Sequence, residues 1–183
     1  MTIKIRNRRK FLREVDKDSL QSVNLCYQCG KCSAGCPLAS FMDILPNQVI
    51  RLVQLGVEDV LECKAIWLCA SCETCTTRCP NGIDIAKVMD RLREMALKSG
   101  IKAAEKNIPA FHHAFLASIE GGGRVNELGM SVRYIVKSKE FFKHLRLGIQ
   151  MMRHGKIKSS HSKIRALREV QDIFKEAKKK GAI

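Results

Sequence analysis

The sequence predicts a mainly α-helical protein, and two observations lead to this fold class. Apolar residues recur at helical spacing in several segments, and proline or glycine stands at the ends of some of them. The stretch that separates two cysteine-rich runs shows the same helical spacing rather than the pattern of strands. At 183 residues the chain is long enough for one core with extensions.

The spacer between the cysteine runs contains the first two predicted helices. Residues 46–55 open with Pro46, which suits a first helical position, and carry a broad apolar stripe. Gly56 fits the residue just past a helix end. A second short helix is predicted from about 57 to 63.

Two more helices are predicted after the second cysteine run. A turn at 81–82 precedes a helix that opens near Asp84 and closes at Gly100. Residues 107–119 are also expected to be helical, and the GGGR segment at 121–124 is expected to form a flexible break or a tight turn. This glycine run lacks the flanking strand and the Lys-Ser/Thr of a phosphate loop.

The C-terminal part is predicted to form two helices, at about 139–152 and 160–180. In the second, Lys and Arg occupy the faces that apolar residues leave free, so the helix is basic and amphipathic. Three interpretations stay open: packing on its own subunit, docking an acidic partner protein, and binding nucleic acid or a membrane surface. The apolar stripe consists of Ile164, Leu167, Val170, Phe174 and Ala177.

Positive charge is distributed unevenly along the chain. The formal net charge is +15, but residues 19–100 carry eight Lys and Arg against eight Asp and Glu. Residues 1–18 carry seven basic against three acidic residues, and residues 133–183 carry fifteen against four. The excess therefore lies in the two ends. Little aromatic interleaving and no recognisable reader motif accompany it, so we expect no nucleic-acid partner.

The chain is expected to be cytoplasmic, without membrane insertion. Its longest apolar run, residues 65–70, is far shorter than the ~20 residues that cross a bilayer. The basic start is followed by no apolar region or cleavage site typical of a secretory signal. In the cytoplasm thiols are kept reduced, so nine cysteines favour metal binding over disulfides.

Two runs of the sequence share the cysteine spelling C-x2-C-x2-C-x3-C-P. They are CYQCGKCSAGCP at 26–37 and CASCETCTTRCP at 69–80. This spelling is typical of [4Fe-4S] clusters: three thiolates on a tight turn reach three corners of one cube, and in two-cluster ferredoxins the fourth comes from the other run. The sequence therefore predicts two [4Fe-4S] clusters with crossed ligands. Cluster 1 is expected to bind Cys26, Cys29, Cys32 and Cys79, and cluster 2 Cys69, Cys72, Cys75 and Cys36.

Zinc is the alternative metal for these cysteines. Zinc ribbons use two C-x2-C pairs across a longer spacer, whereas each run here has three such thiols in a row before its C-P. The ninth cysteine, Cys63, is interpreted as a small buried hydrophobe in a helix, with a regulatory thiol or reserve ligand as alternatives. His112 and His113 have no ligand partners at suitable spacing and are expected to be packing or surface residues.

The two runs and their helical spacer resemble the α-helical ferredoxin module of the succinate dehydrogenase iron–sulfur subunit and of several anaerobic oxidoreductases. The whole layout is similar to the C-type iron–sulfur subunits of the soluble heterodisulfide reductases of methanogens. That wider likeness rests on the basic N-terminal arm, on both cysteine runs, and on GRVNELGMSVRYIVKSK and MMRHGK in the C-terminal part.

This resemblance implies an electron-relay subunit of an oxidoreductase, with no catalytic residue of its own. In the family, single electrons pass through two [4Fe-4S] clusters from a flavin-containing, electron-bifurcating subunit to the catalytic subunit, which reduces the coenzyme M–coenzyme B heterodisulfide. A hydrogenase or formate dehydrogenase supplies the electrons. The chain fits a relay because it has no adjacent Cys-Cys pair and no glycine-rich dinucleotide fingerprint.

Three parts are expected along the chain. They are a basic N-terminal arm at 1–20, an α-helical di-cluster ferredoxin domain at 21–100, and a basic helical extension for partner docking at 101–183. Residues within the runs are expected to tune the clusters, including Gly30, Lys31, Ser33, Ser71 and Thr74. The alternatives are an iron–sulfur subunit of a succinate, fumarate or glycerol-3-phosphate dehydrogenase-type complex, and a basic nucleic-acid-binding protein with structural metal sites.

Overall fold

The structure is a computed structural model that describes residues 8–16, 23–138, 149–151, 153–155 and 164–180. Within these ranges all regular elements are helices, which confirms the predicted mainly α fold class. The α-helices are α1 (Arg8–Asp16), α2 (Lys31–Ala34), α3 (Pro46–Leu55), α4 (Ala65–Leu68), α5 (Thr74–Thr77), α6 (Ile85–Lys98), α7 (Asn107–Gly122), α8 (Glu127–Ser138) and α10 (Leu167–Lys179). The 3-10 helices are η1 (Val23–Leu25), η2 (Ala39–Phe41) and η3 (Glu58–Glu62).

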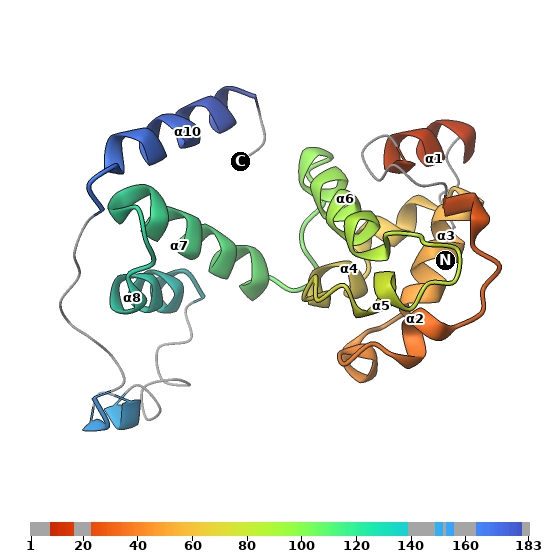
Figure 1. Ribbon diagram of the computed structural model, residues 1–183, viewed down its shortest axis with the longest axis horizontal. Coiled ribbons are helices and arrows are strands. Elements are labelled where there is room, and N and C mark those ends of the chain that lie inside the picture. Colours follow the sequence, from red (N-terminus) through yellow and green to blue (C-terminus); the bar gives the residue numbers. More distant parts are fainter. Residues whose placement is uncertain (1–7, 17–22, 139–148, 152, 156–163, 181–183) are drawn as a thin grey trace. The chain divides into compact units, whose positions relative to one another are not determined.

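The chain forms two compact units, Met1–Glu105 and Lys106–Ile183 (Figure 1). The expected three-part division at residues 20 and 100 stays a prediction. Part of the expected N-terminal arm forms helix α1. This helix packs against α3 and α6, and its residues Phe11 and Val15 are fully buried. None of the helices in the described part of the chain is long and apolar enough to cross a membrane.

Helices α3 and α6 form the core of the first unit, and both begin and end as the sequence predicts. Pro46 occupies the first turn of α3, and Gly56 ends the helix with a left-handed backbone at φ 73°. The Asp84 side chain accepts a hydrogen bond from the Lys87 amide at the start of α6. The apolar faces of the two helices are buried, with Val49, Ile50, Val53, Val88, Met89 and Leu92 at most 1% exposed.

In the second unit, α7 packs against both α8 and α10 (Figure 1). The predicted apolar stripe of α10 is its least exposed face, with Phe174 buried and the other four members half-buried. Lys178 of α10 also forms an ion pair with Glu120 of α7, at 2.6 Å. Packing on its own subunit is therefore part of what α10 does.

The structure differs from the predicted helices in three places. Residues 57–63 contain the 3-10 helix η3 rather than an α-helix, and α7 continues through the first two glycines of the 121–124 run. Helix α8 was not predicted, although Asn126, whose side chain accepts a hydrogen bond from the Gly129 amide, is a good helix-start residue. Most of the helix predicted at 139–152 lies outside the described residues.

Gly123 should be far less tolerant of a side chain than its neighbour Gly121. Gly123 ends α7 with φ 75°, and a Cβ there would overlap the side chain of Ile164, whereas a Cβ at Gly121 would meet nothing within 4 Å. Gly123→Ala should lower the free energy of unfolding by about 2 kcal/mol or more. Gly121→Ala should leave it unchanged or raise it by up to about 1 kcal/mol.

Urea denaturation and amide exchange of α7 and α10, measured on the iron-loaded full chain, would check this pair. Equal effects of the two substitutions would contradict the packing of residue 164 on the end of α7.

Candidate functional site

The eight cysteines of the two runs divide between two cavities of the first unit, and each cavity takes three cysteines from one run and one from the other. The first cavity, called site 1 here, is lined by Cys26, Cys29, Cys32 and Cys79. The second, called site 2, is lined by Cys36, Cys69, Cys72 and Cys75. The structure thus brings together the two sets of four that the sequence predicted as ligands, and the ligand assignment itself stays a prediction.

The residues present suit a four-iron cube. Each cavity is lined by four thiols. Most of the other lining residues are apolar, as in Ile50 and Ile83 of site 1 and Leu38 and Met89 of site 2. Among the described residues, no three His, Cys, Asp or Glu side chains are grouped as they would be around a single metal ion. The four thiols surround a cavity instead.

The backbone of the two runs bends in the same way at equivalent positions. In each run the residues before and after the second cysteine have left-handed conformations: Gln28 (φ 64°) and Gly30 (φ 78°) in the first, Ser71 (φ 49°) and Glu73 (φ 58°) in the second. Only glycine adopts such conformations without cost. Alternating left- and right-handed residues form concave groups of N–H donors that bind anions, including iron–sulfur clusters. The same bend appears in two unlike sequences, which indicates that the site requires it.

A hydroxyl directly after the third cysteine connects each run to the helix that follows it. Ser33 Oγ donates to Asn47 Oδ1 at 2.6 Å and accepts from the Asn47 amide in the first turn of α3. Thr76 Oγ1 donates to Asp84 Oδ1 at 3.2 Å and accepts from the Ala86 amide in the first turn of α6. The helices α2 and α5, which carry the third cysteines, also pack against each other. The two sites are therefore built from one repeated unit.

Long-range hydrogen bonds hold the ends of the runs. Buried Gln54 of α3 donates to the carbonyls of Val23 and Cys26, at 3.0 and 2.9 Å. The Asn81 side chain, beyond the second run, donates to the carbonyl of Leu25. Asp43 accepts from the amides of residues 64 and 65, just before the second run. These bonds within the protein position the cysteines of both runs.

Sequence reasoning missed two side chains of site 1. Gln28 Nε2 donates to Cys26 Sγ at 3.3 Å, and Asn47 Nδ2 holds the Gln28 side chain by donating to its Oε1 at 3.3 Å. Gln28 lies within the first run and could have been considered with its neighbours. Asn47 is separated from the run in sequence, and only the folded structure brings it to the site.

Burial makes several thiols of the sites weak acids. It raises the pKa of Cys32 and Cys69, and it raises the pKa of Cys75 to about 11. The hydrogen bond with Thr74 instead lowers the pKa of the exposed Cys72. Iron binds thiolates, so the buried positions must release protons when a cluster is assembled.

Cys63 belongs to neither site. It is buried at the end of η3, where its thiol donates a hydrogen bond to the Val60 carbonyl at 3.0 Å. Burial raises its pKa to about 11. The residue therefore has the surroundings of a small buried hydrophobe, as interpreted from the sequence, although it follows a 3-10 helix.

The two histidines lie on the outer part of α7. His112 and His113 are exposed, and the ring of His112 makes an edge contact with Phe111 at a centroid distance of 6.3 Å. Their surroundings are those expected for surface residues.

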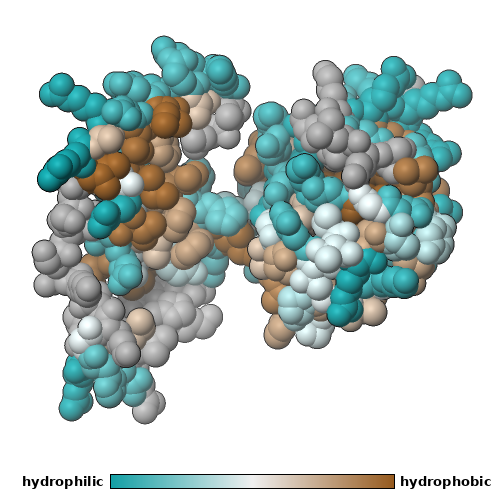
Figure 2. Space-filling view, viewed as in Figure 1, coloured by the Kyte–Doolittle hydropathy of each residue, from teal (hydrophilic) through white to brown (hydrophobic). Residues whose placement is uncertain are grey.

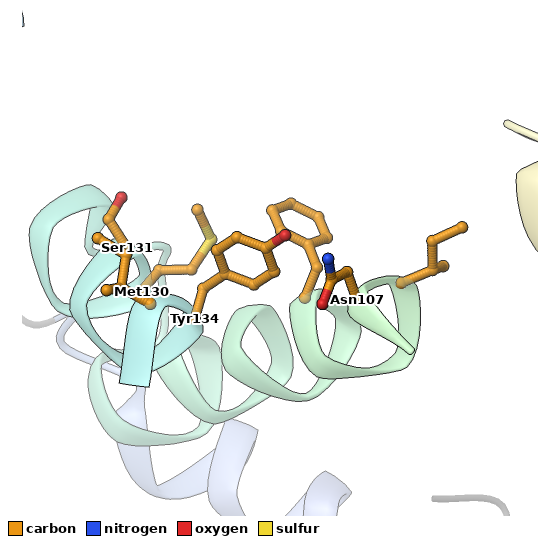
Figure 3. A pocket seen from close by; sticks show the side chains of 7 residues that line it. Asn107, Met130, Ser131 and Tyr134 are labelled. Atoms are coloured by element: carbon orange, nitrogen blue, oxygen red, sulfur yellow. The ribbon is translucent and has the colours of Figure 1, made fainter. Parts of the chain in front are cut away.

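The second unit carries an apolar groove of about 420 Å³ between α7 and α8. Figure 3 shows Met130, Ser131 and Tyr134 of α8 and Asn107 of α7 lining it. Phe111, also in the groove, is 42% exposed. Hydrophobic residues gather over the visible face of this unit in Figure 2. An exposed apolar area of this kind is typical of a protein-binding surface.

Comparison with known families identifies the cysteine-bearing part of the chain. Residues 22–83 match the family model described as a 4Fe-4S dicluster domain. The cofactors of this chain are therefore two [4Fe-4S] clusters, as predicted.

The chain is similar to subunits of heterodisulfide reductases from three organisms. It is 33% identical over 113 residues to the second C-type iron-sulfur subunit of CoB–CoM heterodisulfide reductase of Methanocaldococcus jannaschii, covering 61% of each chain. It is 37% identical over 98 residues to the C-type subunit of ferredoxin:CoB-CoM heterodisulfide reductase of Methanosarcina acetivorans, covering 51% of this chain and 40% of that one. It is 33% identical over 91 residues to the C2 subunit of H(2)/formate:CoB-CoM heterodisulfide,ferredoxin reductase of Methanococcus maripaludis, covering half of each.

The matched regions span between 40 and 61% of the length of these relatives. The chain is thus an iron–sulfur electron-transfer protein related to the C-type subunits of heterodisulfide reductases.

Cys63 should be unreactive in the folded protein. Because its pKa is raised from 9.0 to about 11, the folded state holds the thiol proton more tightly than the unfolded state does. This contribution to stability is present below about pH 9 and is lost as the pH rises toward 11. Iodoacetamide at pH 8 should therefore leave Cys63 unmodified in the iron-loaded protein and modify it after unfolding in urea.

A Ser131→Cys variant, at an exposed position of α8, is the matched control and should be modified in the folded state. Rapid native-state modification of Cys63, read by mass spectrometry, would contradict its buried position.

Proposed function

We propose that this chain is the electron-relay subunit of a heterodisulfide reductase complex. It would pass single electrons from a flavin-containing subunit to the catalytic subunit that reduces the coenzyme M–coenzyme B heterodisulfide. One observation carries the proposal: the eight cysteines form two sets around two cavities of one domain, and each set includes a cysteine from both runs. Two redox centres in one domain suit a protein that passes electrons on better than a protein in which electron transfer ends.

The proposed ligands are those of the two sites. Site 1 would hold one cluster through Cys26, Cys29, Cys32 and Cys79, and site 2 the other through Cys36, Cys69, Cys72 and Cys75. When bound, [4Fe-4S] clusters supply reversible one-electron chemistry. The residues of the chain hold the thiolates, direct backbone N–H groups toward them, and exclude water with apolar side chains.

The proposed partners are a flavin-containing, electron-bifurcating subunit and the catalytic subunit, with an associated hydrogenase or formate dehydrogenase. The names of the relatives, which include H(2), formate and ferredoxin, support this choice. The apolar groove between α7 and α8 and the outer, basic face of α10 are the proposed docking surfaces. Both belong to the second unit, whereas the cysteine sites belong to the first.

Crossed ligation can be tested by comparing cysteine variants in pairs. Cys79→Ser should lose the same cluster as Cys29→Ser, and Cys36→Ser the same cluster as Cys72→Ser, because the members of each pair line one cavity. Each variant should retain about four of eight irons. Iron and sulfide analysis with EPR spectra of the dithionite-reduced protein would provide the comparison.

If Cys79→Ser instead matched Cys72→Ser, each run would bind its own cluster and the crossed assignment would be wrong. Zinc without sulfide in the purified wild-type chain would remove the relay function itself.

Docking through the tail should be separable from folding. Deleting the residues after 158 should weaken co-purification with the partner subunits, with the iron content nearly unchanged. The charge reversals Arg168→Glu and Lys175→Glu, at two exposed positions of α10, should weaken it as well without exposing the apolar surface of α7. An undisturbed complex in both cases would contradict docking by α10, and loss of iron from the truncated chain would show that the tail supports the cluster domain.

A further inference from the structure

We propose that site 2 is where electrons enter this chain and site 1 is where they leave, because the side chains around the two sites favour the reduced state at site 1. This inference rests on the relay function proposed above. It goes beyond that function in assigning a direction and naming the residues that set it. Reduction adds a negative charge to a cluster, so N–H donors and cations raise its reduction potential and carboxylates lower it.

Site 1 has a side-chain N–H donor to sulfur, whereas the recorded N–H bonds to Cys69 and Cys75 of site 2 come from the backbone. Gln28 Nε2 donates to Cys26 Sγ, and the Ile83 amide donates to Cys79 Sγ, both at 3.3 Å. Hydrogen bonds to a sulfur that carries negative charge stabilise that charge. Hydrogen bonds fix the orientation of the Gln28 side chain, because Asn47 donates to its Oε1 and itself accepts from Ser33 Oγ.

The positions of the second run and of α6 that correspond to Gln28 and Asn47 carry different residues. Ser71 takes the place of Gln28, and its hydroxyl donates to Asp90 Oδ1 at 3.1 Å instead of to a sulfur. Ala86 takes the place of Asn47 and has no polar side-chain atom. Side-chain hydrogen bonds of the site 2 sulfurs are made with hydroxyl groups: Cys72 Sγ donates to Thr74 Oγ1 at 3.5 Å, and Cys75 bonds with the side chain of Thr76. Neither partner is an N–H donor.

The charged residues that line the two cavities differ in the same direction. Lys31 lines site 1, whereas Glu73 lines site 2, and both lie within two positions of the second cysteine of their run. A cation near Cys69 of site 2, Arg93, is paired with Asp90 at 2.6 Å, so its charge is largely balanced.

The two differences together give the direction. An electron that reaches site 2 from the flavin-containing partner would move to site 1, so that site 2 is oxidised as site 1 is reduced. The acceptor subunit would then take the electron from site 1. Each tenfold preference for site 1 in this equilibrium corresponds to about 59 mV for one electron.

The test is a redox titration of the anaerobically purified, iron-loaded full chain with dithionite, followed by EPR. Gln28→Met keeps the length of the side chain and removes its N–H donor, so it should lower the higher of the two potentials. Ser71→Ala is the matched control at the equivalent position of site 2 and should shift neither potential by as much. If Gln28→Met lowered the lower potential, or if the two variants had equal effects, the assignment would be overturned.

A second variant keeps the test independent of Gln28. Glu73→Gln changes an exposed charge and leaves the cysteines untouched, so it should raise the lower potential and narrow the separation. A rise of the higher potential instead would reverse the proposed direction.

Iron analysis separates this inference from the function on which it rests. A wild-type chain without about eight irons would refute the relay. With the irons present and the potentials ordered the other way, only the direction would be wrong.

Discussion

The structure depends on one constraint: a short turn of backbone can present three thiols to one cavity, but the fourth must come from elsewhere. Each run supplies the fourth thiol of the other run's cavity: Cys79 lines the cavity of the first run, and Cys36 lines that of the second. Neither site is then complete without both runs. The surrounding helices serve this exchange, because α3 and α6 each begin at a hydroxyl supplied by the run before them. The contacts that start these helices are thus also contacts that position the cysteine runs.

The sites require backbone strain that glycine would relieve. Three residues other than glycine, Gln28, Ser71 and Glu73, have positive φ in the described part of the chain, and all lie beside the second cysteine of a run. Such conformations cost about 1–3 kcal/mol each and persist where the surrounding structure fixes them. These positions carry residues with side chains although glycine would adopt the conformation more easily. The side chains of Gln28 and Ser71 form hydrogen bonds near the sites. The strain is therefore connected with the environment of the clusters.

Sequence patterns predicted what local chemistry determines. The bounds of α3 and the start of α6 followed from Pro46, Gly56 and Asp84, and the cofactors followed from the spacing of the cysteines. The features that the sequence did not predict depend on contacts between residues far apart in the chain. Asn47 reaches Gln28 across 19 positions, and nothing in its own neighbourhood marks it as a site residue. Helix α8 was missed because Gly129 and its β-branched residues are poor helix formers. Packing against α7 outweighs that weak preference.

The exposure of the cysteines explains why a protein of this kind would work within a complex. In each run the second cysteine, Cys29 or Cys72, is exposed, whereas the other cysteines of the runs are buried or half-buried. Electrons would cross the protein boundary most easily at these exposed thiolates, yet water there also stabilises charge and raises the potential of a cluster. A partner that covered the exposed edge would exclude this water and bring its own redox centre close. Site 1, bordered by Lys31, and site 2, bordered by Glu73, would then suit partner surfaces of opposite charge. The residues proposed to order the potentials would therefore also help each partner to bind at its own site.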